Sequence, residues 1–102
     1  MENLELLAFK IISSVGTARS MFIEAIQKAK EKQFAEAYQM IENGIQLFNE
    51  GHRAHHDLLT MDTNGELSSI PLLIIHAEDL LMSTETSKIF ALELISIYER
   101  CE

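Results

Sequence analysis

The sequence predicts an all-α fold, an antiparallel up-down-up bundle of three helices. Apolar residues recur at steps of three and four along three long segments, as on one face of a helix. Only four glycines and one proline occur among 102 residues, and polar–apolar alternation never lasts the length of a strand. No linker, charge block or internal repeat divides the chain. We therefore expect one domain over residues 1–102, with short connections and a thin core.

The first predicted helix has an apolar stripe from Leu4 to Ala29. Lys28, Lys30 and Lys32 follow at its last turn, where positive charge favours a helix C-terminus. The members of the stripe are Leu4, Leu7, Ala8, Ile11, Val15, Ala18, Phe22, Ala25, Ile26 and Ala29. We expect this stripe to face the other two helices.

The second predicted helix follows a turn at residues 31–33 and ends in the stretch 61–65, where Asn64-Gly65 is a turn signal. Its apolar stripe includes two histidines, His52 and His55, which we expect to line the bundle. The stripe consists of Phe34, Ala37, Tyr38, Ile41, Ile45, Phe48, His52, His55 and Leu59.

The third predicted helix begins with Ser68 or Ser69 as N-cap and Pro71 in the first turn, and it runs to about Tyr98. At 100° per residue, its first half is apolar nearly all round, which is typical of a buried helix. Two other helices in the chain cannot cover every side of it. We therefore expect a symmetric oligomer with the third helices inside.

Charge and composition exclude several classes of function. Eight basic against sixteen acidic side chains give a net charge of -8, which argues against nucleic acid or an anionic membrane as partner. The longest uninterrupted apolar run, Ile70 to Ile75, is too short to span a bilayer, and no signal peptide opens the chain. The single cysteine, Cys101, allows no internal disulfide. These features indicate a soluble protein of the cytoplasm.

Four polar side chains interrupt the apolar third helix: His76, Glu78, Asp79 and Ser83. His76 and Asp79 are three residues apart, and Ser83 continues their face. Burial of such groups is costly unless they are paired or bind something. From spacing alone, a hydrogen-bonded histidine beside a surface carboxylate explains the pattern as well as a functional site does.

Three segments resemble the IIA component of the lactose/cellobiose-type phosphoenolpyruvate-dependent sugar phosphotransferase system. They are Gly16-Thr17-Ala18-Arg19-Ser20, Asn49-Glu50-Gly51-His52, and the stretch from Ile74 to Ser83, which is similar to the family's aliphatic run followed by His-Ala-Gln-Asp-His-Leu-Met-Thr. Their order and the chain length also match the family. The sequence departs from the pattern at Glu78 (glutamine in the family), Leu80 (histidine), Gly51 (alanine) and Ser83 (threonine), and at His55, where glutamine is common.

The resemblance implies a phosphoryl carrier that is a homotrimer of three-helix bundles. His76 would accept the phosphoryl group from the histidine-containing phosphocarrier protein and pass it to a cysteine of the cognate IIB protein. Asp79 matches an aspartate near the threefold axis, where three copies hold a divalent cation. Mg²⁺ suits such a set of oxygen ligands. No cofactor other than this cation is implied.

The chemistry of the residues agrees with these roles. Imidazole, with an ordinary pKa of about 6.5, is both a nucleophile and a good leaving group near neutral pH. Two alternatives stay open: a metal-binding oligomeric bundle that uses His52, His55, His56 and His76, and an oligomeric interaction module whose His76 is structural. The sugar also stays open, since a IIA protein need not touch it; lactose, cellobiose, chitobiose and related β-glucosides are all compatible.

Overall fold

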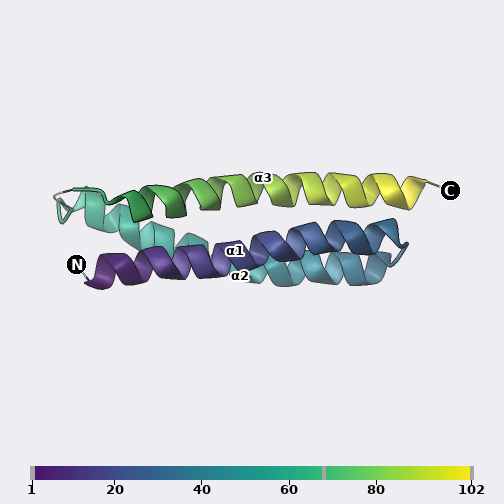
Figure 1. The fold of residues 1–102 in the computed structure, drawn as a ribbon, viewed down its shortest axis with the longest axis horizontal. Helices are drawn as coiled ribbons and strands as arrows, with labels where there is room; N and C mark the ends of the chain where they lie inside the picture. The colour runs from purple at the N-terminus through teal and green to yellow at the C-terminus, as the bar shows by residue number, and fades with distance from the viewer. Residues whose placement is uncertain (1, 68, 102) are drawn as a thin grey trace.

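A computed structural model describes residues 2–67 and 69–101, which form three long helices: α1 (Glu2–Lys30), α2 (Phe34–Thr63) and α3 (Leu72–Arg100). The helices run up, down and up in a bundle of 56 × 18 × 16 Å. The N-terminus and the α2–α3 connection lie at one end, and the α1–α2 turn and the C-terminus at the other (Figure 1). No strand occurs in the described part of the chain. The predicted three-helix fold is confirmed.

The first two helices end where the sequence predicts. After α1, Lys32 adopts a positive φ of 65° and Gln33 donates its backbone N–H to the carbonyl of Lys28 at 2.9 Å. The second helix ends at its C-cap, Asn64, and Gly65 follows at φ 73°, in the left-handed region that glycine adopts without strain.

The start of α3 differs from the prediction of a serine cap. The N-cap is Pro71, with no side-chain capping hydrogen bond, and its carbonyl accepts the backbone N–H of Ile74 at 3.0 Å. Ser69 precedes the cap in a bend, and Ser68 lies outside the described residues. Proline serves here because its extended backbone (φ −64°, ψ 153°) leads directly into the helix. The helix continues two residues past Tyr98, to Arg100.

The apolar stripe of α1 is confirmed as the centre of the core. Eight of its ten members are buried, and Leu7 and Ile26 are partly buried. By length and composition α1 is apolar enough to cross a membrane, which the length of uninterrupted apolar runs did not reveal. Its stripe is instead covered by α2 and α3, as expected of the core helix of a bundle.

The stripe of α2 is partly wrong. Tyr38, His52 and Leu59 are exposed and His55 is half-buried, whereas several residues that the stripe left out are buried. The buried residues of α2 are Ala37, Ile41, Gly44, Phe48, Gly51, Ala54 and Leu58. The predicted stripe of α2 left out Gly44 and Gly51, because apolar periodicity does not count glycine.

Gly44 and Gly51 are buried because side chains of α1 occupy the space that a Cβ would need. A Cβ on Gly44 would lie 2.6 Å from Cε1 of Phe22, and one on Gly51 would lie 2.3 Å from Cγ2 of Val15. Both distances are far inside van der Waals contact. These two glycines therefore fix how closely α1 and α2 approach.

We expect Gly51→Ala to destabilise the protein by about 1–2 kcal/mol, because overpacking outweighs the gain of about 1 kcal/mol in helix propensity. Val15→Ala should relieve the clash, so the double variant should be more stable than Gly51→Ala. Gly16→Ala is the matched control, since a Cβ there would lie 3.9 Å from Leu80 and meets no clash. Urea unfolding measures all three, and a Gly51→Ala protein as stable as Gly16→Ala would contradict this prediction.

Candidate functional site

The predicted site residues His76, Asp79 and Ser83 all lie on the exposed side of α3. Their spacing of three and four residues places them on one face, as the sequence predicts. The Ser83 hydroxyl donates to the Leu80 carbonyl of its own helix at 3.2 Å. Within the described residues, the His76 imidazole has no hydrogen-bond or ion-pair partner. The His76 imidazole is therefore accessible to a partner molecule.

Exposed apolar side chains lie around these polar groups on α3. Seven large apolar side chains of α3 are exposed, among them Leu72 at 80%, Met82 at 67% and Ile75 at 53%. The others are Ile89, Phe90, Leu94 and Ile97. Asp79 lies between Ile75 and Met82 at steps of four and three, so its carboxylate sits within an apolar stripe. Such a stripe on one helix is typical of a surface that a partner covers.

Glu78 belongs to a different face of α3. Two residues correspond to about 200° around a helix, so Glu78 points away from His76. Its Oε1 lies 3.1 Å from Nε2 of His55 on α2. Sequence reasoning noted both residues as departures from the family pattern but did not predict that they meet.

The histidines of α2 do not form the cluster that the metal-binding alternative needs. His52 stacks on Phe48, with ring centres 6.3 Å apart and an interplanar angle of 16°. His55 contacts Glu78, and His56 is exposed. In residues 2–67 and 69–101, no three His, Cys, Asp or Glu side chains come together as a metal site.

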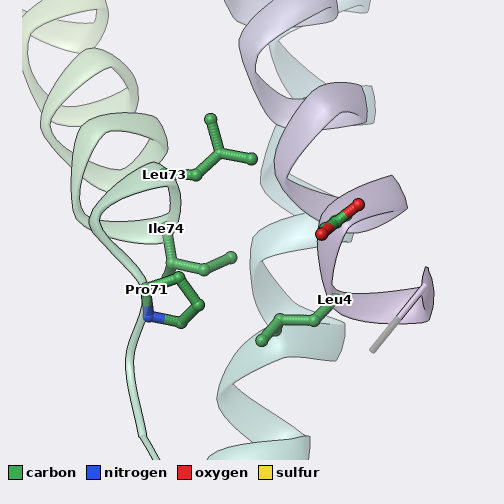
Figure 2. A pocket seen from close by; sticks show the side chains of 5 residues that line it. Leu4, Pro71, Leu73 and Ile74 are labelled. Carbon is green, nitrogen blue, oxygen red and sulfur yellow. The ribbon is translucent and has the colours of Figure 1, made fainter.

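Two small hollows lie at the His76 end of the bundle. One, of about 100 Å³, lies between the beginnings of α1 and α3. Leu4 on α1 faces Leu73 and Ile74 on α3 across it, with Pro71 at the edge, as Figure 2 shows. A drug-sized ligand or a disaccharide fills a pocket of about 300 Å³ or more. A hollow of this size suits contact between macromolecules better than sugar binding.

The structure thus defines a helical protein with one exposed histidine on an apolar helix face. A sequence model of the lactose/cellobiose-specific IIA subunit of the phosphotransferase system matches residues 6–99. A lactose-specific EIIA component of Staphylococcus aureus is 35% identical over 97% of this chain and 96% of its own. The chain belongs to this IIA family.

Solved structures agree. The cellobiose-specific enzyme IIA of Bacillus anthracis superposes with a TM-score of 0.93 at 36% identity, covering 98% of this chain and 92% of its own. The IIA(chitobiose) of Escherichia coli, solved in complex with HPr, has a TM-score of 0.83 at 29% identity, over 95% of this chain and 94% of its own. The resemblance seen in the three sequence segments is therefore confirmed along nearly the whole chain.

Proposed function

We propose that this protein is a phosphoryl carrier in which His76 is the phosphorylated residue. Three features support the assignment: His76 lies in the segment that matches the family pattern, it is exposed, and His52 and His55 of α2 are engaged elsewhere. The donor is the histidine-containing phosphocarrier protein, as the chitobiose IIA–HPr complex suggests. The acceptor is a cysteine of the cognate IIB protein, and the protein works in the cytoplasm.

Each transfer exchanges one bond to phosphorus for another. A neutral nitrogen of His76 attacks the phosphohistidine of the donor; a new N–P bond forms as the donor's N–P bond breaks, and the donor imidazole leaves. In the second transfer the IIB thiolate attacks, an S–P bond forms, and His76 leaves. Phosphoryl transfer needs positioning and charge stabilisation more than covalent help. An exposed histidine meets this need, because the partner proteins can supply the remaining groups of the site when they dock.

The assembly we propose is a homotrimer with the exposed apolar face of α3 at its centre. Ile75, Met82 and Ile89 repeat every seven residues along this face and are 53–67% exposed in the single chain. A seven-residue apolar repeat is the pattern by which helices pack around a common axis. The trimer would cover apolar surface that one chain leaves in water.

Asp79 would hold a divalent cation in this trimer, with Mg²⁺ as the best match. The carboxylate is exposed between Ile75 and Met82 on the face that the trimer would bury. One chain supplies one carboxylate, so the ligand set is complete only where three copies meet. The cation would neutralise three like charges with the oxygen ligands that Mg²⁺ prefers.

Uptake of a lactose/cellobiose-type sugar is the process that the carrier would serve. The relatives and similar structures have names that differ in the sugar, namely lactose, cellobiose and chitobiose. The small hollows of the described structure contain no feature that selects among them. The choice of sugar belongs to the partner proteins.

Phosphoenolpyruvate, enzyme I and the phosphocarrier protein HPr provide the direct test. Incubation with all three should add one acid-labile phosphate per chain, measured by intact-mass spectrometry. Omission of HPr is the control and should leave the mass unchanged. A chain that gains no phosphate with the complete set would exclude the carrier function and favour the interaction module.

We expect phosphoryl transfer from HPr to slow as ionic strength rises. At a net charge of -8, the protein should attract basic patches on its partners, and such steering acts mainly on association rates. Between about 0.01 and 0.15 M salt the Debye length falls from about 30 to 8 Å. Stopped-flow or quench measurements at limiting donor check this, and a rate indifferent to salt over that range would contradict steering.

A further inference from the structure

Within residues 2–67 and 69–101, three side-chain contacts that involve a polar or charged group link α3 to α2. Helix α3 otherwise packs mainly on α1 and only sparsely on α2. The three contacts are the His55–Glu78 pair at 3.1 Å, the Nζ of Lys88 at 5.8 Å from the ring centre of Phe48, and the hydrogen bond from the Tyr38 hydroxyl to Glu99. The first of them is the one near His76.

The His55–Glu78 pair is well placed to fix the segment that carries His76. Glu78 follows His76 by two residues, within the same helical turn. The His55 side chain is only 14% exposed, whereas that of Glu78 is 48% exposed. One end of the contact is therefore held firmly in α2, and the other belongs to the turn of the reactive histidine.

The other contacts that hold this turn in place are apolar and therefore non-directional. Its helix starts at Pro71 without a side-chain cap, and Ile74 and Ala77 bind the core by apolar contact. Apolar contact tolerates a small roll of the helix about its axis. A roll of about 10° moves an atom about 6 Å from the axis by about 1 Å. A misplacement of 1 Å can lower a rate by up to about a hundredfold.

We propose that His55 is a positioning residue for phosphoryl transfer, which it serves by holding Glu78 and thereby the turn of α3 that carries His76. The inference rests on the proposed function of His76. His55 and Glu78 act as a unit, because within the described residues each makes its side-chain hydrogen bond to the other. An amide–amide hydrogen bond can make the same connection without charge.

The test is a set of steady-state phosphorylation rates measured against the concentration of HPr. The variants are His55→Ala, Glu78→Ala, both together, and the double glutamine variant. His56→Ala, an exposed neighbour on α2, is the matched control. Amide hydrogen exchange of residues 76–79 and circular dichroism of the trimer accompany each rate.

We expect each alanine variant, and the alanine pair, to lower the maximal rate about tenfold with the KM for HPr within about twofold of wild type. The double glutamine variant should return to within about twofold of the wild-type rate. Exchange of residues 76–79 should be faster in the alanine variants alone, and His56→Ala should resemble wild type. If His55→Ala loses helicity, Glu78→Ala, whose side chain is half-exposed, decides.

Three outcomes would overturn the inference: unchanged maximal rates in the alanine variants, a raised KM with an unchanged maximal rate, or a double glutamine variant as slow as the alanine pair. The second would place the pair in partner docking instead. A wild-type protein that takes up no phosphate would exclude the proposed function itself. Hydrogen exchange would still show, without phosphate, whether the pair fixes this turn.

Discussion

His76→Gln is expected to abolish phosphate uptake from HPr while leaving the fold and the proposed trimer intact. Glutamine keeps a polar side chain of similar length but has no nucleophilic ring nitrogen, so no N–P bond can form. Because His76 is exposed and has no partner within the described residues, its loss leaves no core cavity and no unpaired buried group. The expected change is a complete loss of the phosphorylated mass.

Substitutions of the α2 histidines are the controls. His52→Gln and His56→Gln should both retain uptake of one phosphate per chain, since His52 stacks on Phe48 and His56 is simply exposed. Circular dichroism and sedimentation show whether each variant keeps its helices and its assembly. Loss of uptake in His52→Gln together with retention in His76→Gln would transfer the carrier role to His52.

The three helices could be predicted from the sequence because the signals that indicate them are local. Apolar steps of three and four, the lysines near the end of α1 and the Asn64-Gly65 turn each depend on a few neighbouring residues. The burial of Gly44 and Gly51 depends instead on Phe22 and Val15 of another helix. Nothing in the sequence of α2 alone indicates which glycine faces α1. The predicted apolar stripe of α2 therefore included exposed residues such as His52.

The candidate site could likewise be predicted where its residues share one helix, but not where residues of two helices meet. His76, Asp79 and Ser83 share a face because their spacing on one helix dictates it. His55 and Glu78 meet because of the axial register between α2 and α3, which is set by packing along the whole bundle. The burial of Thr84 is a second feature that depends on packing between helices. Thr84 is fully buried, and its hydroxyl has no hydrogen-bond partner within the described residues. Burial of that hydroxyl follows from packing and not from the sequence pattern.

Chelation is expected to loosen the proposed trimer at neutral pH by removing the cation that we propose at Asp79. Three carboxylates on the axis of that trimer would repel one another, and a divalent ion would relieve the repulsion with oxygen ligands. Without the ion, buried charges are left uncompensated, which costs about 3–5 kcal/mol in comparable cases. Sedimentation velocity of the wild type with and without chelator measures the change, and re-addition of Mg²⁺ should reverse it.

Asp79→Leu should have the opposite behaviour, a trimer that persists in chelator. Leucine removes the charge and extends the apolar stripe formed by Ile75, Met82 and Ile89, all of which are exposed in the single chain. Asp79→Asn is the matched control: it removes the charge without adding apolar surface, so its trimer should be indifferent to chelator but weaker than that of Asp79→Leu. A wild-type trimer unchanged by chelator, with a monomeric Asp79→Leu, would mean that Asp79 acts through a hydrogen bond or ion pair between subunits and that no cation lies on the axis.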